Sequence, residues 1–273
     1  MVVSLSKVEQ SAPALVSLYK TAGASVETYG LSGQTVVVYL VVDYSYSMKS
    51  YYKDGSVQAL ADRVLGLSAH LGDDGTVPVV FFSSDVNTLT EIALGDHEGR
   101  IDRIVAGLGS MGGTNYHRAM DAVIRHYRES GSTAPALVLF HTDGEPNSKS
   151  EAERLLYEAA KLPIFWQFIG LGDQNSGQFR FLKKLDQLAD PQKRPIDNAG
   201  FFAVGRNARR MSDAKLYDLM LSEFPTWLAA ARAQGIVSTG PDGQAIVRPE
   251  SALRDSSAPA PERRGFWARL LDR

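Results

Sequence analysis

Three short polar segments of the chain carry oxygen-bearing side chains suited to binding a metal ion. In the first, Asp43-Tyr44-Ser45-Tyr46-Ser47, a carboxylate is followed by two hydroxyls at alternate positions. The others are Gly112-Gly113-Thr114 and Thr142-Asp143-Gly144. Hard cations such as Mg²⁺, Mn²⁺ and Ca²⁺ prefer oxygen ligands, so the three segments together predict a divalent-cation site. The candidate ligands are Asp43, Ser45, Ser47, Thr114 and Asp143.

Two apolar runs are expected to position these segments. The run 36–42 is rich in β-branched residues and leads directly into the first segment, and 136–140 precedes the segment with Asp143. Short, wholly apolar runs are typical of strands buried on both faces of a parallel sheet. In an open α/β sheet, ligands bind outside the carboxyl ends of the strands, at the switch point where the first and fourth strands are neighbours. We therefore expect Asp43 and Asp143 to meet there, with Thr114 in reach from the start of a helix.

The rest of the chain alternates between strand-like and helix-like patterns. Residues 49–55 are expected to form a loop before this alternation continues. The expected helices are 57–71, 101–108, 116–127, 150–161 and 179–189, with a last helical region over 213–234 that Pro225 is expected to restart. The further strands are 77–82, 88–93, 164–169 and 201–204. Such alternation implies right-handed crossovers and a covered sheet. The predicted fold class is α/β, an open, mostly parallel, doubly wound sheet with helices on both faces.

Composition divides the chain into four parts. Residues 1–34 are expected to form an N-terminal helical extension, with a helix over 11–23, and 35–236 the α/β domain. The stretch 237–262 is rich in proline, glycine and serine, which predicts a flexible linker. The final residues, 263–273, differ in character and are expected to form a short amphipathic peptide.

Composition also excludes several classes of protein. The formal net charge is -2, from 29 basic and 31 acidic residues, so nothing in it points to nucleic acid as a partner. With 0 cysteines there can be no disulfides, thiolate zinc sites or cysteine nucleophiles. The first residues do not resemble a signal peptide, and the longest apolar runs fall short of the roughly 18 residues that span a bilayer. We therefore expect a cytoplasmic protein.

The three polar segments, in this order and after these strands, resemble the metal-ion-dependent adhesion site of von Willebrand factor A domains. The resemblance covers about 35–235, and the overall layout is similar to the A-domain proteins of bacterial tellurium-resistance (Ter) gene clusters. It implies that Ser45, Ser47 and Thr114 are direct ligands, whereas Asp43 and Asp143 bind directly or through water. It also implies a non-enzymatic, metal-dependent protein-binding module in a tellurite-resistance or stress-response complex, whose partner offers an acidic residue to the metal.

One position departs from the family pattern, which usually has glycine before the second serine. Here that residue is Tyr46. A tyrosine with positive φ is strained by about 1–3 kcal/mol, or else the phenol stands at the rim of the site and contacts a partner. Glu145 is a further candidate for contact with a partner or the metal's surroundings, or is simply a turn residue beside Pro146. His141 is expected in the core and His117 on an exposed helix face.

Two alternatives stay open at this point. A metal-dependent phosphoester hydrolase would need a base beside metal-bound water, and Glu145 is the candidate for it. A structural scaffold whose metal site is degenerate is the other. The sequence has no P-loop and no Gly-x-Ser-x-Gly elbow, so other common enzyme classes are not indicated.

The C-terminal peptide has an apolar face of its own. In a helix, Phe266, Trp267, Leu270 and Leu271 would lie together, with four arginines around them in 263–273. We expect this face to dock into a groove of a second partner. A membrane surface is the competing prediction, because basic residues with aromatic ones also suit an interface. A frayed chain end is the third.

Overall fold

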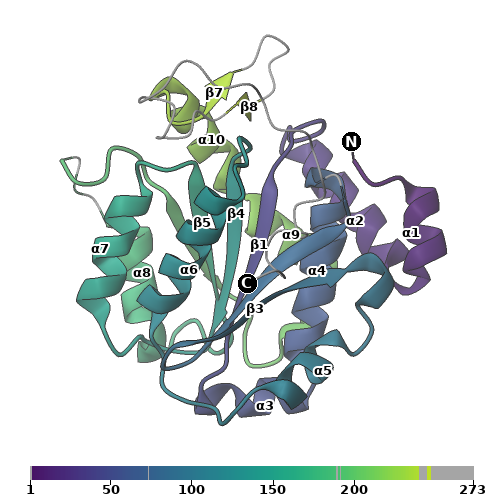
Figure 1. The fold of residues 1–273 in the computed structure, drawn as a ribbon, viewed down its shortest axis with the longest axis horizontal. Coiled ribbons are helices and arrows are strands. Elements are labelled where there is room, and N and C mark those ends of the chain that lie inside the picture. The colour runs from purple at the N-terminus through teal and green to yellow at the C-terminus, as the bar shows by residue number, and fades with distance from the viewer. Residues whose placement is uncertain (1, 73, 189, 191, 240–244, 247–273) are drawn as a thin grey trace.

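A six-stranded sheet forms the centre of the computed structural model (Figure 1). The structure describes the chain except for residues 1, 73, 189, 191, 240–244 and 247–273. The strand order is β3-β2-β1-β4-β5-β6, and every neighbouring pair is parallel except β2 with β3. The strands are β1 (Val37–Asp43), β2 (Thr76–Phe82), β3 (Val86–Ala93), β4 (Ala136–Thr142), β5 (Ile164–Gly170) and β6 (Ala199–Ala203).

The predicted α/β class is confirmed, and so is the predicted pairing of the two apolar strands. β1 lies between β2 and β4, and Val42 of β1 is in register with His141 of β4. Every residue of β4 is buried, as a central strand requires. The strand that was expected at 88–93 is β3, an antiparallel edge strand. Because β1 and β4 are parallel neighbours, the residues that follow them meet at one edge of the sheet.

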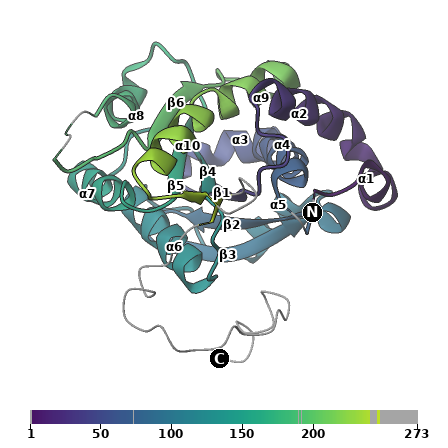
Figure 2. The ribbon, with the colours of Figure 1, turned by 90° about the horizontal axis from the view of Figure 1, so that it is seen from above.

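Helices cover both faces of the sheet (Figure 2). Alternate residues of β1 enter opposite cores: Val38, Leu40 and Val42 pack toward one face, and Tyr39 and Val41 toward the other. Helices α2, α4, α9 and α10 pack on the first face and α6, α7 and α8 on the second. The helices are α1 (Leu5–Ser11), α2 (Val16–Thr28), α3 (Lys49–Lys53), α4 (Ser56–Leu71), α5 (Arg100–Gly107), α6 (Tyr116–Glu129), α7 (Lys149–Ala159), α8 (Arg180–Asp186), α9 (Asp213–Leu221) and α10 (Phe224–Ala233).

Two expected elements differ from those observed. The single helix expected over 11–23 is two helices, because the Ser4 side chain caps an earlier helix and Pro13 opens a short 3₁₀ segment before α2. The loop expected over 49–55 contains the short helix α3. The helical region expected over 213–234 does restart at Pro225: it consists of α9 and α10, and Pro225 lies in the first turn of α10, as its fixed φ favours.

The N-terminal helices share the core of the sheet domain. Val8, Leu15, Ala22 and Val26 are buried in the same cluster as β1 and α4. On the surface of α2, Tyr19 stacks on His70 of α4, with ring centroids 3.9 Å apart. The helical extension is therefore part of the packing that supports the sheet.

Part of the predicted linker is paired. β7 (Ser238–Thr239) and β8 (Ala245–Ile246) form a short antiparallel ladder between residues 237 and 262. The predicted amphipathic peptide, 263–273, lies outside the described residues. Among the helices that the structure describes, none is long and apolar enough to cross a membrane.

Glu223, the residue just before α10, is an acid whose protonation should affect stability. Burial, reinforced by the nearby carboxylates Asp186 and Asp197 and opposed by Arg194, raises the pKa of Glu223 to about 7. The folded state therefore holds this proton more tightly than the unfolded chain. That contribution to stability is present at low pH and is lost as the pH rises from about 4.5 to about 7.

Glu223→Gln should consequently be more stable than the wild type at pH 8 and nearly equal to it at about pH 4. After discounting for the half-exposed position, the gain at pH 8 is about 1–2 kcal/mol. Thermal unfolding of both proteins across this pH range measures it, with exposed Glu9→Gln as the control. An equal gain in stability at both pH values would show that the gain does not come from the ionisation of Glu223.

Candidate metal centre

Asp43, the last residue of β1, is fully buried at the carboxyl edge of the sheet. One carboxylate oxygen, Oδ1, accepts the backbone N–H of Ser45 at 2.7 Å, and the other, Oδ2, accepts the hydroxyl of Thr142 at 2.7 Å. The first bond turns the chain directly after the strand, and the second ties β1 to the end of β4. The carboxylate is thereby held in one orientation.

Two serine hydroxyls and a second carboxylate lie beside it. Ser45 Oγ is 3.1 Å from Ser47 Oγ, and Ser47 Oγ donates to Asp143 Oδ1 at 2.8 Å. Adjacent ligands of an octahedral ion with bonds of 2.0–2.1 Å are about 2.9 Å apart, so the two hydroxyls have nearly the spacing of neighbouring ligands. Because Ser47 donates its hydrogen to Asp143, Ser45 is the donor between the two hydroxyls, and Ser47 keeps one further lone pair that can face a cation.

The loop that carries Thr114 is fixed against the first segment through its backbone. Ser45 pairs with Gly112 in an isolated parallel bridge, and Asn147 N donates to Thr114 O at 2.8 Å. A Cβ on Gly113 would lie 2.6 Å from Asn147 Nδ2, and one on Gly112 would lie 2.8 Å from a serine hydroxyl of the loop after β2. The two glycines therefore allow the close packing that brings Thr114 to the same edge.

Three side chains that support the site were not singled out in the sequence. Thr142 Oγ1 accepts a hydrogen bond from Tyr116 OH at 3.1 Å, and the hydroxyl of Thr142 donates a hydrogen bond to Asp43. Tyr52 OH donates to the backbone oxygen of Asp43 at 2.8 Å. Thr142 lies within the third segment, so its hydroxyl was visible there. The two tyrosines carry no local signal, because they reach the site only through the packing of α6 and α3.

The electrostatics of the site fit a cation. Burial raises the pKa of Asp43 to about 7, and the charge of Asp143 adds to this against the hydrogen bonds from Thr142 and Ser45. Burial also raises the pKa of Asp143. Among the described residues, no lysine or arginine forms an ion pair with either carboxylate. Two desolvated acids without a basic partner favour a positive ion between them.

The donor set distinguishes this centre from sites built on acids and histidines. Within the described part of the chain there is no group of three or more His, Cys, Asp or Glu side chains that could hold a metal. Two carboxylates with two serine hydroxyls, and the hydroxyl of Thr114 on the adjoining loop as the remaining candidate, would make a hard oxygen set, which suits Mg²⁺, Mn²⁺ or Ca²⁺ better than zinc. The residues present therefore fit the cation that the sequence predicts.

The expected backbone strain at Tyr46 is wrong. None of the described non-glycine residues has positive φ, and Tyr46 begins a regular 3₁₀ turn, Tyr46–Met48. Its backbone N–H donates to Gly112 O at 3.2 Å, so the loop accommodates the tyrosine without a left-handed residue. The side chain is 70% exposed, with Lys49 Nζ 5.5 Å from the ring centroid. Its position at the rim agrees with the alternative of a contact surface.

Tyr46→Gly should therefore not stabilise the protein. Glycine adds entropy to the unfolded chain, so a loss of about 0.5–1 kcal/mol is expected, while Tyr46→Ala should stay within about 0.5 kcal/mol of the wild type. Because no metal-ligating atom is removed, Mn²⁺ affinity should be unchanged in both. Thermal unfolding and calorimetric titration measure the two quantities. A clear rise in melting temperature for Tyr46→Gly would restore the strain account.

The other candidate residues take supporting positions. Glu145 accepts the backbone N–H of Phe181 at 3.3 Å and pairs with Lys149 at 2.5 Å. His141 is buried in β4, as expected for a core histidine, and burial lowers its pKa to about 3. His117 is half-buried rather than fully exposed.

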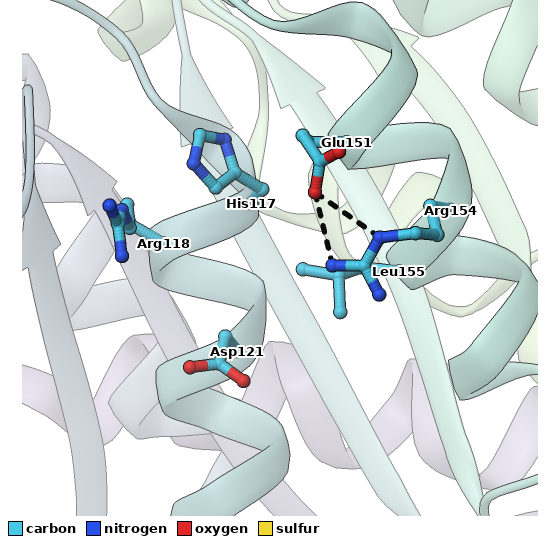
Figure 3. A pocket seen from close by; sticks show the side chains of 6 residues that line it. All are labelled: His117, Arg118, Asp121, Glu151, Arg154 and Leu155. Atoms are coloured by element: carbon cyan, nitrogen blue, oxygen red, sulfur yellow. Dashed lines mark hydrogen bonds and ion pairs between the residues drawn. The ribbon is translucent and has the colours of Figure 1, made fainter.

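His117 lines a cavity between α6 and α7 (Figure 3). The cavity has a volume of about 390 Å³ and a lining of mixed charge. Arg154 there is already bound by Glu151 and Glu158, at 3.0 and 2.5 Å. Because its charges are largely neutralised internally, we assign this cavity no role in the metal site.

Known proteins resemble this chain at the level of both sequence and fold. Uncharacterized protein YcbR of Bacillus subtilis (strain 168) is 32% identical over 254 residues, which cover 91% of this chain and 94% of that protein. A von Willebrand factor type A protein from Catenulispora acidiphila matches 70% of this chain with 15% identity and a TM-score of 0.44, and the matched part is 42% of its own length. The manganese-loaded TRAP protein of Plasmodium vivax matches 69% of this chain and 74% of its own, with 20% identity and a TM-score of 0.47.

The family comparison covers most of the α/β domain. Residues 35–237 match the vWA-TerF-like model, which describes the von Willebrand factor A domain found in the C terminus of TerF. The matched residues contain all three polar segments. The chain belongs to the vWA-TerF-like family of von Willebrand factor A domains.

Proposed function

We propose that this protein is a non-enzymatic binding module that holds a divalent cation and uses it to bind an acidic side chain of a protein partner. Mg²⁺ and Mn²⁺ are the preferred ions, with Ca²⁺ as a further candidate. The observation that carries the proposal is the geometry at Ser47, whose hydroxyl lies 3.1 Å from Ser45 Oγ and donates to Asp143 at 2.8 Å. The proposed metal-binding residues are Asp43, Ser45, Ser47, Thr114 and Asp143.

The composition of the site explains why a partner is needed. Hydroxyl ligands are neutral, so an ion held mainly by Ser45, Ser47 and Thr114 keeps much of its positive charge. A dication and a carboxylate about 4 Å apart attract by roughly 8 kcal/mol at an effective dielectric of 20, before desolvation is subtracted. The ion alone should therefore bind weakly, and a partner's carboxylate should complete its coordination.

The surroundings of Glu145 favour binding over hydrolysis. This residue is the candidate general base for a phosphoester hydrolase, yet its two oxygens are engaged by Phe181 N and Lys149. A base that activates metal-bound water needs a free, oriented lone pair. We therefore place hydrolysis below binding.

The biological setting that we propose is a cytoplasmic tellurite-resistance or stress-response complex. It rests on the family description, which names TerF. A second partner, either a protein groove or a membrane surface, is proposed for the C-terminal peptide with Phe266, Trp267, Leu270 and Leu271.

The proposal is tested with metal and a defined carboxylate. Chelator-treated protein is titrated with Mn²⁺ and Mg²⁺ by calorimetry, and then with a short peptide carrying one glutamate among glycines. Binding of the glutamate peptide that requires the metal, and is absent for the matched glutamine peptide, is expected. Equal binding of both peptides, or binding that survives chelator, would overturn the proposal. Assay of a phosphodiester substrate under the same conditions tests hydrolysis.

A further inference from the structure

Four exposed cations lie along one side of the candidate metal centre. Lys49 and Lys53 belong to α3, which starts two residues after Ser47, and Arg206 and Arg209 belong to the segment after β6. We call these four residues the basic rim. Helix α3 lies at the edge of the sheet where β1 ends (Figure 1).

Hydrogen bonds join the two halves of the basic rim. Tyr51 OH on α3 donates to Leu171 O at 2.9 Å, which ties α3 to the loop after β5. In that loop Gly172 pairs with Gly205, immediately before Arg206. Arg209 then returns to α3, since its Nη1 donates to Asp54 O at 3.1 Å. The segments 49–54 and 205–209 are therefore neighbours.

The basic rim also borders the metal centre. Ser47 lies in the 3₁₀ turn that leads into α3 and is bonded to Asp143. Burial raises the pKa of Tyr51, the carboxylates of Asp143 and Asp54 add to this rise, and Arg206 opposes it. The Tyr51 hydroxyl on α3 is thus close enough to both a proposed metal-site acid and a rim cation for their charges to affect its pKa.

The rim cations are not neutralised by the protein. In the described part of the chain, none of the four forms an ion pair with an acid. Two acids adjoin these segments, Asp54 next to Lys53 and Asp173 next to Gly172, and each uses one carboxylate oxygen to hold a backbone N–H two residues on. Several exposed arginines elsewhere are paired, such as Arg103 with Asp96. Because the whole chain is slightly acidic, with a formal net charge of -2, the rim is a local excess of positive charge.

We infer that the basic rim binds an acidic peptide segment of the partner protein, with one carboxylate on the metal ion and further carboxylates on Arg206, Arg209 and the α3 lysines. This inference rests on the proposed function and adds the partner's chemistry to it. Guanidinium groups recognise carboxylates through paired N–H donors, so the two arginines are the main contacts. Tyr46 lies beside Lys49 of the basic rim and supplies an exposed aromatic surface there. Complementary charge of this kind chooses the partner and speeds its association.

The test compares two labelled peptides by fluorescence anisotropy in the presence of Mn²⁺. One peptide has a single glutamate flanked by glutamines, and the other has six consecutive glutamates. The wild type should prefer the six-glutamate peptide, and added salt should reduce the preference. Arg206→Gln/Arg209→Gln should lose about 5- to 10-fold of affinity for that peptide, with Mn²⁺ affinity and single-glutamate binding unchanged.

The matched control is Arg125→Gln/Arg154→Gln, which removes two exposed arginines from α6 and α7. It should bind both peptides as the wild type does. Equal losses in the two double variants, or no loss in the rim variant, would overturn the inference. So would tighter binding of an oligothymidylate of the same charge. Failure of the single-glutamate peptide to require Mn²⁺ in the wild type would instead count against the proposed function.

Discussion

Replacing Asp143 by asparagine is expected to weaken Mn²⁺ binding by about 100-fold or more while leaving the metal-free fold at least as stable as the wild type. Asparagine has the same shape, and its side-chain oxygen can still accept the bond from Ser47. What disappears is a negative charge in a desolvated site. That charge helps to raise the pKa of Asp43, so the two carboxylates repel each other in the metal-free protein. Removing the charge of Asp143 therefore relieves this repulsion in the folded, metal-free protein, and it also removes a proposed contact to the ion.

The opposite signs of these two effects make the experiment decisive. Calorimetric titration gives the Mn²⁺ affinity, and thermal unfolding in chelator gives the stability of the metal-free form. The matched control is Asp173→Asn, which removes an exposed carboxylate from the loop after β5. The control should bind Mn²⁺ as the wild type does. Unchanged affinity in Asp143→Asn would show that the metal site has been placed wrongly.

The sheet was predictable because its central strands carry a strong, local signal. The runs at 36–42 and 136–140 are apolar throughout, since β1 and β4 are covered on both faces. The helix ends were less predictable. Ser11 is of a residue type that often caps helices, but here it is the last residue of α1, and Ser4 is the N-terminal cap of that helix. Helix α3 has no burial pattern of its own, and its tyrosines are used for bonds to Leu171 O and Asp43 O.

The meeting of Asp43 and Asp143 at the candidate metal centre was predictable, but the side chains that support them were not. Asp43 and Asp143 follow strands whose adjacency comes from the topology, so their meeting could be inferred. The bond from Tyr116 OH to Thr142 joins residues 26 positions apart and depends on how α6 packs on the sheet. The strain expected at Tyr46 came from the family pattern, whereas the 3₁₀ turn here has ordinary φ. Sequence patterns identify the residue types of the candidate site, but they do not show how its loops pack against one another.

Metal binding should also depend steeply on pH. Burial raises the pKa of Asp43 to about 7, and a cation binds the ionised carboxylate in competition with a proton. Below pH 7 the Mn²⁺ affinity should therefore fall about tenfold per pH unit, or about 30-fold between pH 8 and pH 5.5. The metal-free fold should show the reverse trend. Because the folded pKa lies above the unfolded value of 3.8, the stability contributed by this proton is present below pH 3.8 and lost as the pH rises to about 7.

Thr142→Val tests whether Asp43 is the group responsible. The hydroxyl of Thr142 donates to Asp43 Oδ2 at 2.7 Å and lowers the pKa of that carboxyl, so its removal should raise the pKa further. The pH profile of Mn²⁺ binding should then move to higher pH, with the affinity partly recovered in more alkaline buffer. Thr142→Ser keeps the hydroxyl and should retain the wild-type profile. A profile that is flat between pH 5.5 and pH 8 in the wild type would mean that Asp43 is ionised throughout, and the burial of this carboxylate would then not control the site.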